Sequence, residues 1–315
     1  MAKKILLNLL RVLVTVIAFW WIFREVHVDT FLQTIKGADW RWLVLAAGLF
    51  AVSQGGCILR WKLLAPPHPR LTIPFLADSF LVGAFFSAFL PTQVGGDVMR
   101  SYDLIKVTGQ WKEPIASVLM DRLIGMLGLL IMAAAAWLAF PPAREDRVIN
   151  SGFFGFCLLV VVAYGVLASR RALKGILSPF GKIGLGQLQS HATQFQETLL
   201  SYLHRPRIVA VCVLISVAIQ ILGILMTVAV TKALGFTIPV LFLFLIVPIV
   251  IMVAQIPVSL NGWGLREGTT VLLLQRIGIN PAMGLSLALV GAVIQLLSGF
   301  IGGFLFLGRQ FRRKR

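Results

Sequence analysis

Long apolar runs constrain this chain more than any other feature of its sequence. They recur along its 315 residues at 5–23, 43–59, 115–140, 153–168, 208–231, 238–258 and 283–307. A bilayer core about 30 Å thick is crossed by a helix of about 20 apolar residues. Charged residues make up only 13% of the chain, against roughly 25% in soluble domains. The sequence therefore predicts an all-α fold, a polytopic helical bundle forming a single integral membrane domain over residues 1–315.

The basic residues predict how this bundle is oriented, because an excess of Lys and Arg marks cytoplasmic loops. Lys3, Lys4, the basic stretch 169–207 and the C-terminal RQFRRKR are expected in the cytoplasm, and the mixed-charge stretch 141–149 outside. We expect a bacterial inner (plasma) membrane protein with both termini cytoplasmic and an uncleaved first helix at 5–23. The net charge of +17 indicates anionic membrane lipid rather than nucleic acid as the partner, since no soluble segment is long enough for a nucleic-acid module.

That orientation holds only if two segments turn back inside the membrane. If residues 74–90 span fully, the basic stretch 169–207 falls outside, contrary to the orientation rule. If 74–112 enters from the cytoplasm and 238–281 enters from the outside, each turning back, the basic segments all fall inside. The sequence thus favours two oppositely oriented re-entrant hairpins, with a fully spanning helix at 74–90 as the alternative.

The two turning points carry related motifs, LPTQVGGDVMR at 90–100 and IPVSLNGWGLRE at 256–267. Counted from Pro91 and from Pro257, glycine stands five positions later and arginine nine positions later. Two halves, 40–140 and 207–308, would then form an inverted repeat of the kind found in transporters, with chance similarity as the alternative. A cytoplasmic connector at 169–206 would join them, and its residues 185–203 show one apolar helical face.

The polar residues of these motifs predict an anion site. Proline ends the entering helix, and the glycines admit positive φ and a close approach of ligand to backbone. Asp97 is suited to N-cap the return helix, whose N-terminus favours anions. Arg100 and Arg266 add guanidinium groups that fit a phosphate. The alternative interpretation is a pair of structural ion pairs, Arg100–Asp97 and Arg266–Glu267.

A third motif, ASVLMDRLIGMLGLL, places Asp121 and Arg122 in an apolar helix, where charged side chains usually face the bundle interior. Alternatively, Arg122 reaches the cytoplasmic interface. Gln220, Gln255 and Gln295 are expected to make interhelix hydrogen bonds. The predicted head-group residues are Gly95, Gly96, Arg100, Arg122, Gly262, Gly264 and Arg266, with Asp97, Asp121 and Glu267 as coupling or ion-pair acids.

No motif of a known catalytic or cofactor site accompanies these residues. The chain contains no GxxxxGK[ST], no HExxH, no nucleophile elbow and no CxxC, and GWGLREG follows no predicted strand. We therefore expect no metal, no cofactor and no catalytic residue. The sequence leaves enzymatic activity uncertain and favours a transporter.

Taken together, P-x3-GGD-x2-R, DR-x2-G and P-x4-G-x-G-x-RE resemble the lysylphosphatidylglycerol synthase transmembrane family, a flippase-like membrane domain. The matching positions are Pro91, Gly95, Gly96, Asp97, Arg100, Asp121, Arg122, Pro257, Gly262, Gly264, Arg266 and Glu267. The resemblance implies an all-helical bundle, and lipid flipping in bifunctional members that also carry a soluble aminoacyl-transferase domain. This chain ends at Arg315 without such a domain, so we expect only the translocase half to apply.

The sequence thus predicts an inner-membrane lipid translocase, a flippase or scramblase. It would hold the head group of an anionic phospholipid or a polyprenyl-phosphate-type lipid between two re-entrant loops. The alternative is a membrane enzyme or accessory subunit acting on an aminoacyl or lipid-linked sugar substrate with a separate synthase. A homo-oligomer and a separate lipid-modifying enzyme are both open as partners.

Overall fold

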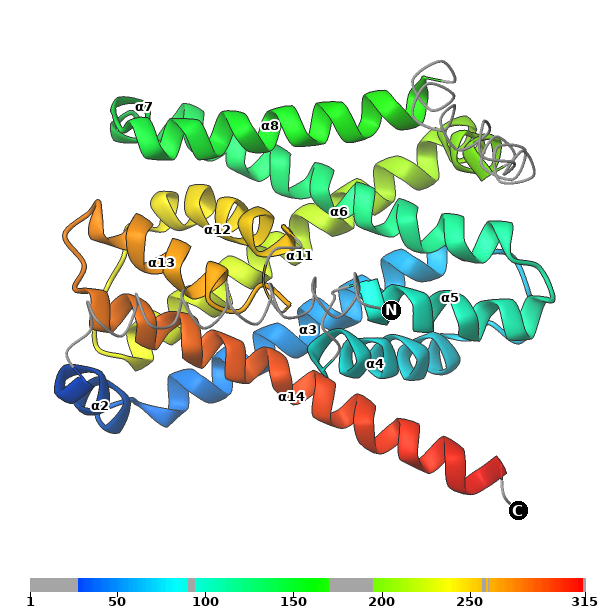
Figure 1. Cartoon of the computed structure of the whole chain (residues 1–315), viewed down its shortest axis with the longest axis horizontal. Helices are drawn as coiled ribbons and strands as arrows, with labels where there is room; N and C mark the ends of the chain where they lie inside the picture. The colour runs from blue at the N-terminus through cyan, green and yellow to red at the C-terminus, as the bar shows by residue number, and fades with distance from the viewer. Residues whose placement is uncertain (1–27, 90–93, 170–194, 257–258, 260, 314–315) are drawn as a thin grey trace, which may run out of the picture.

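The computed structural model describes residues 28–89, 94–169, 195–256, 259 and 261–313, and within these ranges every regular element is a helix. The all-α prediction is confirmed. Five of the described helices are long and apolar enough to cross a membrane. They are α3 (Trp40–Leu64), α6 (Lys112–Ala139), α8 (Arg147–Ala168), α11 (Pro206–Ala233) and α14 (Pro281–Arg313). They run roughly along the long axis of the molecule (Figure 1). The first helix expected at 5–23 lies outside the described residues.

The ends of these helices follow local sequence signals. A short helix, α2 (Val28–Lys36), precedes α3, whose N-cap is Asp39: its carboxylate accepts a 2.9 Å hydrogen bond from the Arg41 amide. The apolar run at 43–59 lies within this helix. The helix expected at 115–140 ends at Ala139, just before two prolines. A one-turn helix, α7 (Pro142–Glu145), leads from there into α8.

Two pairs of shorter helices form opposed hairpins. One pair is α4 (Ile73–Phe89) and α5 (Val94–Thr108), and the other is α12 (Val240–Gln255) and α13 (Leu265–Gln275). Both turn near the middle of the molecule, and their bases lie at opposite ends of its long axis (Figure 1). At 1.5 Å per residue, α13 is about 17 Å long, well short of a bilayer core. Pro91 and Pro257, the residues on which the motifs align, lie outside the described residues.

The hairpins pack against the long helices in a reciprocal pattern. The first hairpin's α4 packs on α14, the second hairpin's α12 packs on α6, and α3 lies against α11. Close approach at the α4–α14 contact requires Gly302, because a Cβ there would lie 1.8 Å from the Leu81 carbonyl oxygen. Two turns further along α14, the Arg309 guanidinium donates to Asp78 on α4 and to Asp103 on α5, each at 2.8 Å. The base of the first hairpin is thereby tied to α14.

Only the end of the connector lies within the described residues. Residues 195–201 are helical and lead into a 3-10 turn, η1 (Tyr202–His204). Leu199, on the expected apolar face, is buried against Leu64 and Cys212. The Tyr202 hydroxyl donates to the Leu64 carbonyl at 2.9 Å. Burial, and then the charge of Glu113, raise the pKa of Tyr202 to about 12, so the hydroxyl keeps the proton it donates.

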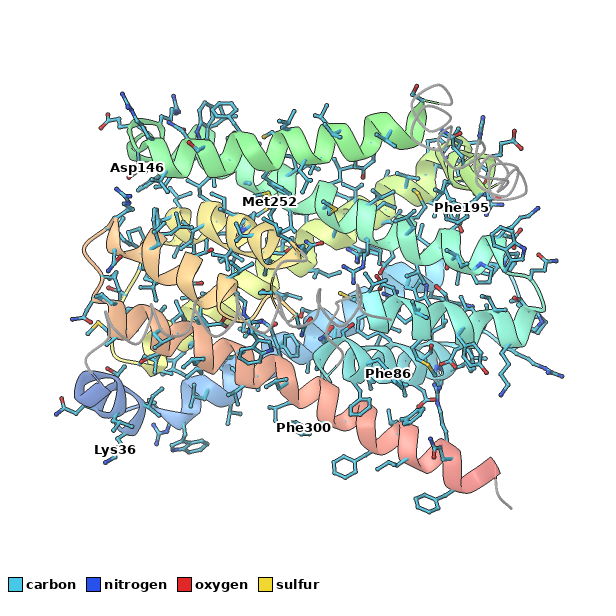
Figure 2. All side chains as sticks on the ribbon, in the orientation of Figure 1. Lys36, Phe86, Asp146, Phe195, Met252 and Phe300 are labelled. Carbon is cyan, nitrogen blue, oxygen red and sulfur yellow. The ribbon has the colours of Figure 1, made fainter. Side chains whose placement is uncertain are left out.

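The outside of the bundle is apolar. Large hydrophobic side chains project from α14 into the surroundings, among them Phe300, which is 51% exposed, and Phe304, which is 75% exposed (Figure 2). Exposed apolar surface of this extent is unusual for a soluble protein and is what contact with lipid tails requires. Together with the five long apolar helices, it identifies a multi-pass membrane protein.

Candidate functional site

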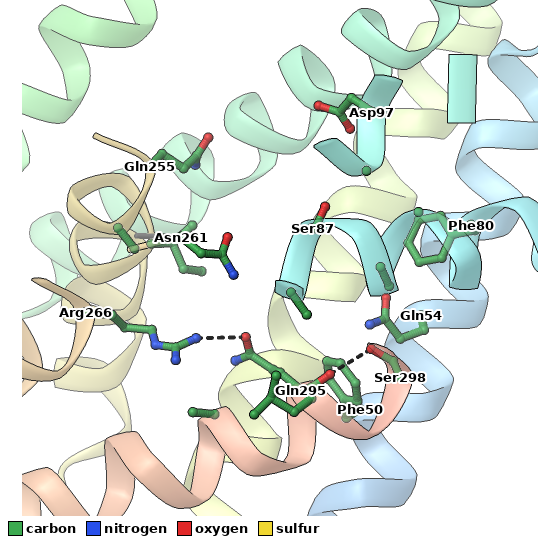
Figure 3. A pocket seen from close by; sticks show the side chains of 18 of the residues that line it. Phe50, Gln54, Phe80, Ser87, Asp97, Gln255, Asn261, Arg266, Gln295 and Ser298 are labelled. Carbon is green, nitrogen blue, oxygen red and sulfur yellow. Dashed lines mark hydrogen bonds between the residues drawn. The ribbon is translucent and has the colours of Figure 1, made fainter. Parts of the chain in front are cut away.

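A cavity of 490 Å³ lies where the tips of the two hairpins meet. The first motif contributes Gly96, Asp97 and Arg100 to its wall, and the second contributes Asn261, Trp263 and Arg266 (Figure 3). The remaining wall comes from α3, α4, α6, α12 and α14. Segments that lie far apart in the sequence thus line one cavity.

Next to the tip of the first hairpin, α4 and α5 cross closely. A Cβ on Gly96 would lie 2.1 Å from the Ser87 hydroxyl and 2.4 Å from the Gly83 carbonyl oxygen. Two predictions are therefore wrong here. Gly96 is helical and serves helix packing rather than positive φ, and Asp97 lies in the first turn of α5, which begins at Val94, so it is not the N-cap.

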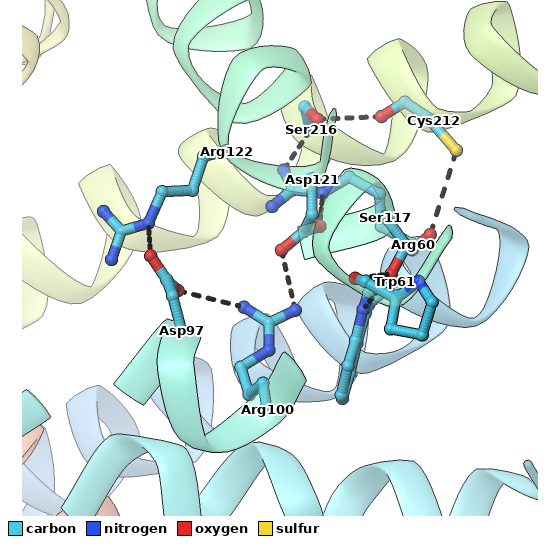
Figure 4. Close-up of polar contacts among 10 residues, drawn as sticks. Arg60, Trp61, Asp97, Arg100, Ser117, Asp121, Arg122, Cys212 and Ser216 are labelled. Atoms are coloured by element: carbon cyan, nitrogen blue, oxygen red, sulfur yellow. Dashed lines mark hydrogen bonds and ion pairs between the residues drawn. The ribbon is translucent and has the colours of Figure 1, made fainter. Parts of the chain in front are cut away.

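Behind this tip, charged residues of α3, α5 and α6 form one network, which Ser216 of α11 joins (Figure 4). Asp121 on α6 accepts from Arg60 on α3 at 2.7 Å through one carboxylate oxygen and from Arg100 on α5 at 3.0 Å through the other. Arg60 also donates to the Ser216 hydroxyl on α11 at 2.8 Å. Because its members come from separate helices, the network fixes the position of the first hairpin relative to α3, α6 and α11.

The network runs from a buried centre to the cavity wall. The Asp121 side chain is 4% exposed and that of Arg100 is 8% exposed, whereas Asp97 is 19% and Arg122 35% exposed. Arg122 donates to Asp97, whose other carboxylate oxygen lies 3.8 Å from Arg100. Arg122 thus lies on the cavity wall and is held there by Asp97 (Figure 4).

Arg100 is held by its ion pair with Asp121 and by stacking on aromatic rings. Its guanidinium carbon lies 4.1 Å from the centre of the Trp61 ring and 5.0 Å from that of Phe80. Its Nε is buried without a hydrogen-bond partner among the described residues. A flat guanidinium held between aromatic faces is pre-organised for a planar or tetrahedral oxyanion.

The tip of the second hairpin is an irregular loop rather than a helix crossing. Asn261, Gly262 and Gly264 have φ values of 51°, 78° and 81°, in the left-handed region. Here the glycines have the role that the sequence predicted. Gly264 is the N-cap of α13, and its amide donates to the Glu267 carboxylate at 2.7 Å.

Arg266 is held mainly by its neighbour in the sequence. Its Nη2 donates to Glu267 at 2.9 Å and its Nε to the same oxygen at 3.1 Å. Its Nη1 donates to the side-chain oxygen of Gln295 on α14 at 3.1 Å (Figure 3). The Glu267 side chain is fully buried, while that of Arg266 is 22% exposed on the cavity wall. The two structural ion pairs considered from the sequence are thus part of the site.

Amide side chains form the rest of the polar wall. Gln54, Gln255 and Asn261 line the cavity, and none has a side-chain hydrogen-bond partner within the described ranges (Figure 3). The expected interhelix bond is confirmed for Gln295 and is wrong for Gln255, since Gln255 faces the cavity instead. Gln220, on α11, likewise has no such bond and lies away from the cavity wall.

The predicted site residues divide into a lining set and a supporting set. Gly96, Asp97, Arg100, Arg122 and Arg266 line the cavity, whereas Gly95, Asp121, Gly262, Gly264 and Glu267 do not. Sequence reasoning missed Arg60, which is 6% exposed and paired with Asp121. The signal that could have found it is Asp121 itself, because a buried carboxylate requires a cationic partner. It also missed Gln54 and Asn261.

Metal chemistry receives no support from the described part of the chain. No group of three His, Cys, Asp or Glu side chains there is arranged to hold a metal ion. Each described carboxylate at the cavity instead accepts from an arginine. The chemistry of this site is that of guanidinium and amide groups, which bind oxyanions and hydroxyls.

Comparison with known proteins assigns the chain to a family. The chain is similar to UPF0104 membrane protein PH1989 of Pyrococcus horikoshii, with 23% identity over 97% of both chains. The family model described as "Lysylphosphatidylglycerol synthase TM region" matches residues 8–303, which include all three motifs and every described helix that lines the cavity. The chain therefore belongs to the lysylphosphatidylglycerol synthase TM region family.

Proposed function

We propose that this protein is a lipid translocase that binds a phosphate-bearing lipid head group in the cavity between its two hairpin tips. One observation carries the proposal. Three arginines, Arg100, Arg122 and Arg266, from both tips and from α6, converge on one cavity inside a bundle whose outer surface is apolar. Cations at such a depth are costly unless they serve a site or a pathway.

The hydrogen bonds of Arg266 suggest how a phosphate enters. A guanidinium has five N–H donors, so Arg266 can keep Glu267 while it exchanges one partner. Its Nη1 now donates to Gln295, a neutral acceptor 3.1 Å away. A phosphate oxygen makes a stronger, charge-assisted bond and would displace that amide. The head group would occupy the cavity while the lipid tails stay against the apolar outside of the bundle.

The opposed hairpins suggest how the site is reached from both sides. In this proposal both are re-entrant, the first entering from the cytoplasm and the second from the outside, which agrees with their opposite directions in Figure 1. Residues 40–140 and 207–308 act as two inverted halves, supported by the reciprocal packing of α4 on α14 and of α12 on α6. Rocking of one half against the other exposes the cavity first to one leaflet and then to the other.

The proposal is tested by reconstituting the protein in liposomes with a fluorescent anionic phospholipid and following its movement between leaflets. Wild-type protein should accelerate the movement above that in protein-free vesicles. The matched variant is Arg122→Gln with Arg266→Gln, since these are the most exposed arginines of the wall. It should fold normally and lose most of this activity. Absence of lipid movement with well-folded wild-type protein would overturn the proposal, and activity that survives the double change would remove the arginines from it.

A further inference from the structure

Among the described residues, the ion pairs around the cavity contain one more arginine than carboxylate. Four arginines, Arg60, Arg100, Arg122 and Arg266, interact with three carboxylates, Asp97, Asp121 and Glu267. Every carboxylate already accepts from at least one arginine. The site is therefore complementary to a ligand with a single negative charge. A phosphodiester carries one negative charge at neutral pH, whereas a phosphate monoester carries about 1.5 to 2.

The same pairing disfavours a cationic head group. An ammonium group needs an acidic acceptor, and Asp97 is the one acidic residue on the described cavity wall. Its two carboxylate oxygens already face Arg122 and Arg100. A second cation placed there would lie among three guanidinium groups and gain no carboxylate of its own.

The unpartnered amides point to hydroxyl groups on the ligand. Gln54, Gln255 and Asn261 each present one acceptor and two N–H donors to the cavity without a protein partner in the described chain. The nitrogen of the Gln295 amide adds further donors, since its oxygen is the atom bonded to Arg266. A hydroxyl both donates and accepts, so it matches an amide in either orientation, whereas an ammonium only donates. Polar groups left unpaired in a membrane bundle are costly unless a ligand or water satisfies them.

Building on the proposed function, we infer that the cavity selects lipids whose head group is a phosphodiester monoanion bearing an uncharged, hydroxyl-rich substituent such as glycerol, inositol or a sugar. The arginines hold the phosphate, and the amides of α3, the second tip and α12 hold the hydroxyls. The volume of 490 Å³ fits a head group of this size rather than a whole lipid. Zwitterionic and aminoacylated head groups are rejected, because their ammonium groups meet guanidinium groups.

Binding to the full-length protein in detergent tests each element of this inference, with acyl chains held constant. Phosphatidylglycerol and phosphatidylinositol should bind about tenfold more tightly than phosphatidylmethanol, which has the same charge and no hydroxyl. Phosphatidylmethanol should in turn bind more tightly than phosphatidylethanolamine and lysylphosphatidylglycerol. Glycerophosphoglycerol, the water-soluble head group, should bind far more weakly than the lipid, and equal affinity would identify a soluble phosphodiester rather than a lipid as the ligand.

The amides are tested with Gln54→Leu combined with Gln255→Leu. This variant should lose the preference for phosphatidylglycerol over phosphatidylmethanol while it binds phosphatidylmethanol as well as wild type does. The matched control is Gln220→Leu, because Gln220 also lacks a hydrogen-bond partner but lies away from the cavity wall. Two results would overturn the inference. One is an unchanged preference for phosphatidylglycerol in the double variant, and the other is wild-type protein that binds lysylphosphatidylglycerol more tightly than phosphatidylglycerol. Selective binding without lipid movement in liposomes would instead overturn the translocase proposal alone.

Discussion

The two hairpin tips that meet at the cavity are built in different ways. The first is a crossing of two regular helices, in which Gly96 packs against Gly83 and Ser87. The second is a loop in which three of the described residues have positive φ, followed by the short helix α13. Similar motif spacing thus accompanies two local structures, with Gly96 helical and Gly262 at positive φ.

The two tips also differ in how their arginines are held. Arg100 belongs to a network that ties α5 to α3 and α6 through Asp121. Arg266 is paired with the next residue in the chain, Glu267, and with one neutral amide. The first tip therefore holds its cation by contacts that also hold the bundle together, while the second holds its cation locally. Changes at the first tip should mainly impair folding, and changes at the second should mainly impair ligand binding.

The largest expected effect concerns the opposite directions of the hairpins. In a cysteine-free background, cysteine at Gln110, in the α5–α6 turn, should react with an impermeant thiol reagent only when the cytoplasmic side is opened. Cysteine at Ile279, in the α13–α14 turn, should react in intact cells. The reason is that the two bases lie at opposite ends of the molecule (Figure 1). Labelling of both positions from the same side would contradict the opposed hairpins, and a cysteine at Arg144, expected outside, is the positive control.

The next largest effect is on stability, and it should differ between Asp121 and Glu267. Asp121→Ala leaves two buried arginines, Arg60 and Arg100, without their common partner, and breaking a buried pair costs about 3–5 kcal/mol. Glu267→Ala should cost less, because Arg266 is 22% exposed and keeps its bond to Gln295. Thermal unfolding of the purified proteins in one detergent measures both. Equal decreases in unfolding temperature would show that the two tips contribute equally to the stability of the bundle.

A third effect concerns the helix crossing of the first tip. Gly96→Ala should destabilise the protein by about 1–3 kcal/mol, since its Cβ would overlap backbone and side-chain atoms of α4. Gly55→Ala on α3 is the matched control, because a Cβ there has no heavy atom within 4 Å. It should be neutral or slightly stabilising, given the better helix propensity of alanine. Equal unfolding temperatures of the two variants would argue against the close crossing.

A smaller effect concerns the cation of the second tip. Arg266→Gln should weaken binding of an anionic phospholipid about tenfold or more, because a charge-assisted hydrogen bond to the phosphate is lost. It should lower stability less than Arg100→Gln does, because the buried Glu267 still accepts from the Gly264 amide. Arg266→Lys should restore the affinity only in part, since an ammonium lacks the planar fork. Arg100→Gln should weaken binding and also lower the unfolding temperature. Binding isotherms paired with thermal unfolding distinguish the two arginines, and identical behaviour would remove the contrast between the tips.

The sequence allowed much of this architecture to be predicted. Apolar runs bounded by prolines give the long helices nearly at their observed bounds, because membrane thickness and proline chemistry are local constraints. The shared spacing of the two motifs predicted that they belong together, and both line one cavity. Their arginines were singled out because a guanidinium fits a phosphate.

Other features depend on tertiary contacts that no local pattern records. An arginine that ends an apolar run signals a cytoplasmic boundary, and this reading hid the bond from Arg60 to Asp121. Gln255 and Gln295 give the same signal in the sequence, yet one faces the cavity and the other bonds Arg266. The role of Gly96 depends on the angle at which α4 and α5 cross, and that angle is set by the packing of both helices.

The smallest expected effect asks whether lipid movement is coupled to protons, and the comparison of the tips identifies the acid to test. A lipid phosphate that binds Arg122 or Arg100 competes with Asp97, which lines the cavity and is 19% exposed. An acid released from its arginine can take a proton, so an imposed pH gradient should change the rate of lipid movement, by less than about tenfold. Glu267 is fully buried and keeps its hydrogen bond from the Gly264 amide, so it should not take part.

In liposomes with the pH gradient and the membrane potential imposed separately, Asp97→Asn should abolish the response to pH while Glu267→Gln retains it. Because the potential is worth about 2.3 kcal/mol per charge per 100 mV, a response to potential alone would identify the net charge of the lipid as the driving term. Movement indifferent to both gradients would mean that the two tips form a passive scramblase and that the ion pairs of the first tip only hold the fold.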